Sequence, residues 1–284
     1  MFLLLILNIL LFNGDSILVK TNELSGFLNA VSITSDGKGK IYVLDALSNE
    51  IIKFDESLKE VKRSGKKGWA NGEYDSPTCI EGSSGLEIHV SDPMNFRIQK
   101  LDLNLSYISS IYTNYESFPE NLKYQTPVST VFINPYIYSI DGENNRIVTY
   151  QYQNQSMYQP AFSFGGFQSA QKPMSKPVKI VKDGLNNIYI FDSKLNTVFK
   201  YDNFGNYLNS MESKYIKSIS AFNNQLYILT DSEILIYDAR KNAYSGRYLF
   251  AEPILSEKLR DFIVFSSAKF FLLEKSKVIE FNLK

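Results

Sequence analysis

The sequence reads Ile188-Tyr-Ile-Phe-Asp-Ser-Lys-Leu-Asn-Thr-Val-Phe-Lys-Tyr-Asp202 in its clearest repeat: an apolar run, a short polar turn and a second apolar run. Weaker copies of the same pattern begin at Ile41, Ile88, Ile137, Leu226 and Phe270. Each first run closes on a polar anchor residue, namely Asp45, Asp92, Asp141, Asp192, Thr230 and Glu274. A strand-rich repeat of roughly 40–50 residues is typical of a β-propeller.

Four strands are expected in each repeat. In the clearest copy they cover residues 177–181, 187–191, 197–201 and 207–211, joined by turn signals such as Asp183-Gly184. The second strand is apolar on both faces, because Ile188 and Ile190 point one way and Tyr189 and Phe191 the other. A sheet with one solvated face would alternate apolar and polar residues, so both faces of this sheet are expected to be covered by neighbouring sheets.

The last repeat has no outer strand of its own before the sequence stops at Lys284. Residues 16–20 form a strand-like segment that belongs to no repeat, and we expect it to supply the missing strand, with 17–20 lying against 278–281. The sequence therefore predicts an all-β fold, a six-bladed β-propeller with four-stranded antiparallel blades, in which the N-terminal strand completes the last blade. Residues 15–284 are expected to form this single domain.

The first residues have a different character. Residues 2–12 are almost wholly apolar, and a small polar stretch follows at 13–16. About eleven apolar residues are too few to cross a bilayer, which takes roughly 20, but they suit the apolar part of a secretory signal. We therefore expect residues 1–14 to be a signal peptide and the mature chain to be exported, to the periplasm or the cell exterior, without a membrane span. The alternatives are a buried first strand and a misplaced start codon.

Charge and cysteine content exclude several classes of function. Thirty basic and thirty acidic residues cancel, which argues against a nucleic-acid partner. Cys79 is the only cysteine, so an intrachain disulfide framework is excluded. We expect a monomer.

The repeats resemble those of the NHL-type six-bladed β-propeller family. The best match is Asp141-Gly-Glu-Asn-Asn-Arg-Ile147, and Asp92-Pro-Met-Asn-Phe-Arg-Ile98 is similar. The glycine-rich stretch 65–77 resembles the family's segment leading into the next blade, and also a group of bacterial secreted six-bladed propellers. The resemblance covers residues 29–281 and implies a rigid ring; it weakens in the last two repeats, where Thr230 and Glu274 replace the anchor aspartate.

Catalytic and metal-binding patterns are weak. His89 and Cys79 are the only soft metal ligands, and His89 occupies a position that tyrosine fills in other repeats, so a histidine-rich zinc site is not expected. The anchor aspartates are interpreted as turn residues that bond their own backbone. On the inner strands Glu81 and Asp261 are the only carboxylates for a calcium ion, and Lys179 would oppose it. Better acids or amides follow at the turns after these strands, where an ordinary turn role is the alternative: Asp36, Asn134, Asp183 and Asn224. We predict no catalytic residue, no metal and no cofactor.

A binding surface remains as the favoured hypothesis. The turns after the second strands and the segments leading into each blade share one rim, and its candidate binding residues are Trp69, Tyr74, Phe96, Arg97, Glu143, Arg146, Phe167 and Lys194. Tryptophan, tyrosine and arginine are enriched at interface hot spots. The alternative is that Trp69 and Phe167 tuck under their own loops and that the arginines brace neighbouring turns.

The sequence thus favours a non-catalytic, NHL-like binding or scaffold module for a protein, peptide or glycan partner at the cell envelope or outside the cell. The rival is a propeller hydrolase or lyase, lactonase-like or esterase-like, that acts at the channel mouth. Three or more converging carboxylates or amides in the channel would favour the enzyme. A channel of serine, threonine and apolar groups beside an exposed aromatic rim would favour binding. A purely structural role in a larger assembly also remains open.

Overall fold

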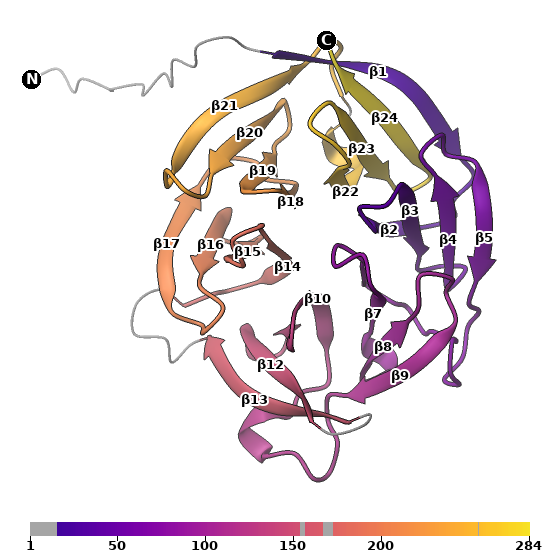
Figure 1. Ribbon diagram of the computed structural model, residues 1–284, viewed down its shortest axis with the longest axis vertical. Coiled ribbons are helices and arrows are strands. Elements are labelled where there is room, and N and C mark those ends of the chain that lie inside the picture. Colours follow the sequence, from indigo (N-terminus) through magenta and orange to yellow (C-terminus); the bar gives the residue numbers. More distant parts are fainter. Residues whose placement is uncertain (1–15, 154–156, 167–172, 255) are drawn as a thin grey trace, which may run out of the picture.

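A computed structural model describes residues 16–153, 157–166, 173–254 and 256–284. These residues form a ring of β-sheets around a central axis (Figure 1). The all-β, propeller-like fold that the repeats predicted is therefore confirmed. The expected signal peptide, residues 1–14, lies outside the described residues.

Four of the sheets have four antiparallel strands each, ordered along the chain from the axis outwards (Figure 1). The first sheet contains β2 (Ala30–Ser35), β3 (Lys40–Asp45), β4 (Glu50–Asp55) and β5 (Glu60–Ser64). The second contains β6 (Cys79–Glu81), β7 (Ile88–Asp92), β8 (Arg97–Leu101) and β9 (Tyr107–Tyr112). The third contains β10 (Pro127–Ile133), β11 (Tyr136–Asp141), β12 (Arg146–Gln153) and β13 (Met157–Gly165). The fourth contains β14 (Pro177–Lys182), β15 (Ile188–Asp192), β16 (Thr197–Tyr201) and β17 (Tyr207–Glu212).

The rest of the ring is one eight-stranded sheet with two halves. One half contains β18 (Ser218–Phe222), β19 (Gln225–Leu229), β20 (Glu233–Asp238) and β21 (Ala243–Phe250). The other contains β22 (Leu259–Val264), β23 (Lys269–Glu274), β24 (Lys277–Leu283) and, outermost, β1 (Ser16–Ser25). The predicted pairing of the two ends of the chain is confirmed, because β1 runs antiparallel to β24. Its register differs from the predicted one: residues 18–20 lie opposite 281–283, and 22–24 lie opposite 278–280.

The structure adds one contact that the repeats did not predict. The start of β1 also pairs in parallel with β21, with Ser16 opposite Tyr248 and Leu18 opposite Phe250. The register of β1 against β24 shifts between Lys20 and Asn22, so the strand bends there as it passes along the edge of the sheet. Because β1 pairs with β21 along one of its edges and with β24 along the other, it joins the halves into one sheet (Figure 1).

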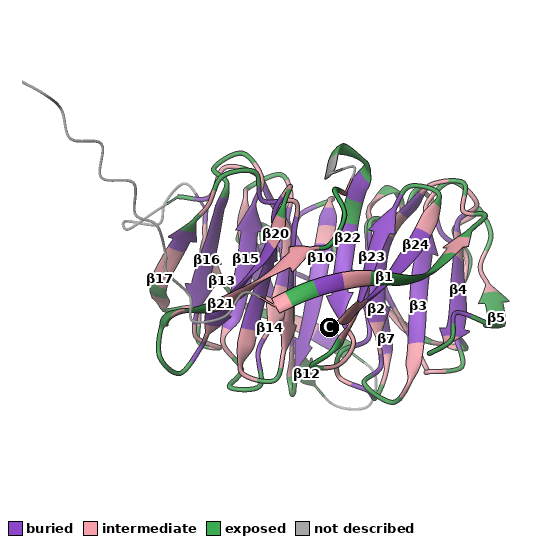
Figure 2. Cartoon of the chain, turned by 90° about the horizontal axis from the view of Figure 1, so that it is seen from above, coloured by how far each residue is buried: buried purple, intermediate pink, exposed green. Residues whose placement is uncertain are grey.

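The core lies between neighbouring sheets, as the two-faced apolar strands predicted. One cluster joins the two halves of the eight-stranded sheet and contains Leu18 with Tyr227, Phe262 and Phe270. Figure 2 shows the burial concentrated in inner strands such as β2, β3 and β22, while the outermost β5 is largely exposed. Each sheet is thus held by its neighbours rather than by a core of its own.

Hydrogen bonds also link the inner strands around the axis. The hydroxyl of Ser32 accepts the Ile80 N–H at 3.2 Å, and the hydroxyl of Ser220 accepts the Val264 N–H at 3.2 Å. The Asp261 carboxylate accepts the Ile33 N–H at 3.1 Å, which links the last sheet to the first. Inner strands have one edge without a neighbouring strand, and these side chains satisfy backbone donors there.

Helical structure in the described residues is confined to three 3-10 turns, η1 (Pro93–Asn95), η2 (Glu120–Leu122) and η3 (Ser256–Lys258). Within the same part of the chain, no helix has the length and apolar character needed to cross a membrane.

Candidate binding face and central channel

The anchor aspartates fasten one face of the ring. Asp45 accepts the backbone N–H groups of Leu47 and Ser48 in its own turn, and also those of Leu28 and Asn29 in the segment leading into its sheet, at 2.6–3.2 Å. Asp192 does the same for Ser175 and Lys176. The structural role predicted for these residues is confirmed. We call this side of the ring, with its turns and its incoming segments, the linker face.

The segment 65–77 is the most firmly held part of the linker face. The Gly68 N–H donates to Tyr74 O at 2.9 Å, and the Tyr74 N–H donates to Lys66 O at 2.9 Å, so the segment folds back on itself. Its ends are tied to two different sheets. Asn95 Nδ2 donates to Gly68 O at 2.9 Å, and the Ser76 N–H donates to Asn49 Oδ1 at 2.8 Å. The glycine-bounded loop is therefore anchored to the turns of the first and second sheets.

Gly65 is required by the close approach at the start of this segment. Its φ is +108°, in the range that favours glycine. A Cβ atom there would lie 2.6 Å from Asn49 O and 2.9 Å from the Tyr74 ring. The glycine therefore lets segment 65–77 lie directly on the turn of the first sheet.

Tyr74 and Arg97, which the sequence analysis placed among the rim's binding residues, are buried. Arg97 Nε donates to Asp92 Oδ2 at 3.0 Å, and its Nη2 donates to Ala70 O and Glu73 O at 3.0 and 2.9 Å. Its cation thus bridges the second sheet's turn and segment 65–77. Both side chains lie beneath the surface, where they support segment 65–77. The structure therefore favours the alternative that Arg97 braces neighbouring turns over the prediction that it contacts a partner.

Trp69 lies above that bracing and is 84% exposed, so it does not tuck under its own loop. Met94 and Phe96 are exposed in the adjacent turn, which Asn95 joins to Gly68. Leu28 and Leu47 are exposed in the neighbouring linker and turn of the first sheet. We refer to Leu28, Leu47, Trp69, Met94 and Phe96 as the apolar arc. Leu28 and Leu47 were missed from the sequence, although apolar residues in otherwise polar turns were a signal for them.

The other candidate rim residues lie elsewhere on the linker face. Glu143 is exposed and accepts the Gln125 N–H at 3.3 Å. Arg146 is half-buried, with Nε 2.8 Å from Asp141 Oδ2 and Nη1 2.6 Å from Asn121 O, so it braces a linker as Arg97 does. Lys194 is exposed in the turn of the fourth sheet. Phe167 lies outside the described residues. The structure therefore places Trp69 and Phe96 in adjacent loops above the buried Tyr74 and Arg97, whereas the remaining described candidates belong to the third and fourth sheets.

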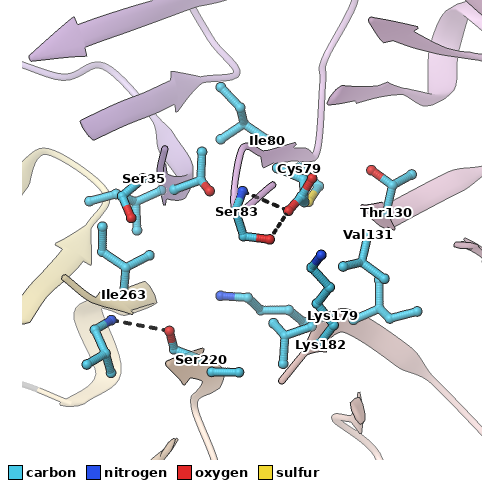
Figure 3. Close-up of a pocket in the computed structure, with 17 residues that line it drawn as sticks. Ser35, Cys79, Ile80, Ser83, Thr130, Val131, Lys179, Lys182, Ser220 and Ile263 are labelled. Carbon is cyan, nitrogen blue, oxygen red and sulfur yellow. Dashed lines mark hydrogen bonds between the residues drawn. The ribbon is translucent and has the colours of Figure 1, made fainter. Parts of the chain in front are cut away.

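The central channel is narrow and mostly lined by hydroxyl and aliphatic groups. A cavity of about 80 Å3 lies between the inner strands, and Figure 3 shows Lys179 and Lys182 extending into it. Lys179 forms an ion pair with Asp261, and Ser218 Oγ donates to the same carboxylate at 2.8 Å. The one channel carboxylate that faces Lys179 is thus already neutralised.

Cys79 lies on the innermost strand of the second sheet, with its Sγ 3.2 Å from Ser129 Oγ. Burial raises the pKa of this thiol, which keeps it protonated and unreactive.

His89 forms a buried charged cluster in the wall of the second sheet. Its Nδ1 lies 3.5 Å from Glu81 Oε2 and its Nε2 lies 3.1 Å from Glu87 Oε1, and Lys100 pairs with Glu87. Burial alone would lower the pKa of His89, but the two carboxylates outweigh burial and raise it. Neither ring nitrogen has a well-aligned hydrogen bond, so the contacts are ion pairs. The imidazole is fully buried and is not available to a ligand in the channel.

No three His, Cys, Asp or Glu side chains converge to form a metal-binding group in the part of the chain that the structure describes. The channel is thus lined mostly by serine, threonine and apolar groups, the composition that favours binding, and Lys179 and Glu81 among its charged groups are paired.

Comparison of the sequence with family models and with curated proteins finds no match. Solved structures do share the fold. A streptogramin B lyase superposes with a TM-score of 0.63 at 12% identity, covering 93% of this chain and 98% of that one. Virginiamycin B lyase from Staphylococcus aureus gives 0.61 at 13% identity, covering 93% and 99%. A catalytically inactive histidine-to-alanine variant of that enzyme with quinupristin gives 0.62 at 12% identity, covering 93% and 99%. At this identity the likeness establishes a β-propeller fold and nothing about activity.

Proposed function

We propose that this chain is a non-catalytic binding module that holds a protein or peptide partner on the apolar arc of its linker face. The observation that carries the proposal is Trp69, which is 84% exposed on a segment whose backbone is fastened to two sheets. An exposed tryptophan on a fixed loop loses little conformational freedom when it binds, so more of its contact energy appears as affinity.

The composition of the arc favours a protein or peptide over a glycan. Leu28, Leu47 and Met94 add exposed aliphatic and thioether groups to the two exposed aromatic residues. Aromatic residues and methionine are enriched at the cores of protein interfaces, where charged residues are depleted. Methionine also adapts its shape to irregular partner surfaces.

We further propose that the ring is a six-bladed propeller of NHL type. Four four-stranded sheets and the two four-stranded halves of the eight-stranded sheet support this count, if β1 belongs to the half that it pairs with in antiparallel fashion. The bracing arginines support the NHL assignment, because Arg97 and Arg146 bond Asp92 and Asp141 five positions earlier in matching turns.

A lyase or hydrolase acting at the channel mouth is the second candidate, and the fold shared with virginiamycin B lyase is the observation in its favour. Three features weigh against it in this chain. His89, the sole histidine, is buried between Glu81 and Glu87. Asp261 is paired with Lys179. The channel cavity of about 80 Å3 is small beside the roughly 300–1,000 Å3 of typical ligand pockets.

Export is proposed from the apolar run at residues 2–12. If the run is a secretory signal, protein recovered from outside the cytoplasm will begin between residues 13 and 16, close to the first residue of β1. Mass spectrometry of the intact protein from fractionated cells measures this terminus. A chain that retains Met1 and stays in the cytoplasm would contradict export and leave the binding proposal standing.

The binding proposal is tested by replacing Trp69 with alanine. Hot-spot tryptophans contribute about 2 kcal/mol or more, so we expect partner affinity to fall about thirtyfold. The partner is first captured from the exported fraction of the source cells with the unmodified protein, and its affinity is then measured by biolayer interferometry.

Phe204→Ala is the matched control, because Phe204 is also a large exposed side chain (74%) but lies in a turn between a third and a fourth strand, on the opposite face of the ring. Partner binding that survives Trp69→Ala, or that falls equally with Phe204→Ala, would rule out the apolar arc as the binding surface.

A further inference from the structure

A second cleft on the ring has features of a small-ligand site, and it is separate from the apolar arc. It has a volume of about 240 Å3 and lies where β1 passes from β21 to β24, beneath residues 251–254. Drug-sized ligands take pockets of roughly 300–1,000 Å3, so this cleft suits a smaller molecule or one side chain of a larger partner.

The cleft borders the last repeat, in which the anchor aspartate is replaced by Glu274. In the first and fourth sheets, the anchor carboxylates of Asp45 and Asp192 each accept hydrogen bonds from two backbone N–H groups of the incoming segment, which hold that segment against the turn. Glu274 stands at this position in the last repeat, and it makes no hydrogen bond to residues 251–254 or to any other described residue. Glu274 and the incoming segment 251–254 therefore line opposite parts of one cleft without a hydrogen bond between them.

The walls of this space are amphipathic. Alternate residues of β23 and β24 face the cleft. Leu272, Ile279 and Phe281 form its apolar floor, and Glu274 lies at one end of that floor. Leu259 adds a further apolar wall. A ligand with an apolar stem would cover this floor and place its end at the carboxylate.

The charge at the end of the floor is negative. Glu274 is only 6% exposed, and its nearest cation is Lys277 Nζ at 3.9 Å. Lys277 and Lys20 each form a closer ion pair with Glu23, at 3.1 and 2.7 Å, and Glu23 offsets part of their positive charge. Glu252 also lines the cleft and has no hydrogen bond or ion pair among the described residues. Lys20 and Lys277 line the same cleft, so three carboxylates, Glu23, Glu252 and Glu274, face two lysines, and the group has one negative charge in excess.

We propose that this cleft binds an ammonium group on an unbranched apolar stem, with the stem over Leu272, Ile279 and Phe281 and the ammonium against Glu274 and Glu252. Charge-assisted hydrogen bonds from an ammonium would satisfy the Glu274 oxygens, which is the strongest polar contact this site can make. The same chemistry is present in a free alkylamine and in the lysine side chain of a peptide.

The test is isothermal titration of the purified protein with n-hexylammonium, 1-hexanol and hexanoate. We expect hexylammonium to bind at least tenfold more tightly than hexanol and hexanoate not to bind. From butylammonium to hexylammonium the affinity should rise about fourfold for each methylene group, until the stem fills the floor. Equal binding of hexylammonium and hexanol, or no binding of hexylammonium, would overturn the proposal.

Variants connect the binding to the cleft. Glu274→Gln should weaken hexylammonium binding at least tenfold and leave hexanol unchanged, and Glu252→Gln, on an exposed side chain, should weaken it without a risk to folding. Glu116→Gln, an exposed carboxylate in the linker between the second and third sheets, is the matched control and should have no effect. Unaltered hexylammonium binding by both cleft variants would overturn the assignment.

The source of the ligand is distinguished by competition with a Leu-Lys-Leu peptide that is blocked at both ends. Displacement of hexylammonium by the peptide assigns the cleft to a lysine of a partner. Failure of the peptide to compete, with hexylammonium binding still sensitive to Glu274→Gln, assigns it to a free amine. Both results uphold the cleft as an ammonium site, and neither depends on the apolar arc.

Discussion

Replacing Leu18 by aspartate is expected to prevent folding or to lower the free energy of unfolding by about 4 kcal/mol or more. Leu18 is fully buried in the cluster between the two halves of the eight-stranded sheet. Its backbone lies opposite both Phe250 of β21 and Leu283 of β24, so a charge at this position would enter the core at the point where one strand joins two edges. Urea denaturation followed by far-ultraviolet circular dichroism measures the effect.

Ile17→Asp is the control for this prediction. Ile17 is the preceding residue of the same strand, but it is 44% exposed, so an aspartate there should cost less than about 1 kcal/mol. If the two variants were equally stable, β1 would not be inserted in the register that closes the ring.

Arg97→Met is expected to destabilise the protein by about 3–5 kcal/mol, because it leaves the buried Asp92 carboxylate without its cation. It also removes two hydrogen bonds that hold segment 65–77 from below, to Ala70 O and Glu73 O. Burial already raises the pKa of Asp92, although its hydrogen bonds and Arg97 act in the opposite direction. Chemical denaturation gives the loss of stability, and the double variant Arg97→Met with Asp92→Asn should recover part of it.

Arg63→Met serves as the comparison for Arg97→Met. Arg63 pairs with Glu50 and Glu60 on the exposed outer strand, where a salt bridge contributes about 0–1 kcal/mol. A loss of similar size in the two arginine variants would mean that Arg97 does not act as a buried brace.

The fold could be predicted because its cause is repeated in the sequence. The two-faced apolar strands that follow Ile41, Ile137 and Ile188 need neighbours on both sides, and a ring of sheets provides them. The missing last strand was also predictable, since Ser16–Lys20 had no repeat of its own. The parallel pairing of β1 with β21 was not, because it depends on how the ends of two sheets meet in space.

The candidate site was only partly predictable, for a reason that Trp69 and Tyr74 illustrate. Both are aromatic residues on the same glycine-bounded segment, yet Trp69 is exposed and Tyr74 is buried. The difference arises from hydrogen bonds to Asn49 and Asn95, which belong to turns distant in sequence. The cleft beside Glu274 was likewise hidden, although the exchange of aspartate for glutamate at an anchor position marked its place.

The proposed binding module depends on segment 65–77 holding Trp69 in a fixed position on the surface of a closed ring. Amide hydrogen exchange of the unmodified protein tests it most directly. We predict slow exchange at the hydrogen-bonded N–H groups of Gly68, Tyr74 and Ser76, together with ready quenching of Trp69 fluorescence by acrylamide. Rapid exchange at all three amides, or a Trp69 side chain shielded from the quencher, would contradict the account.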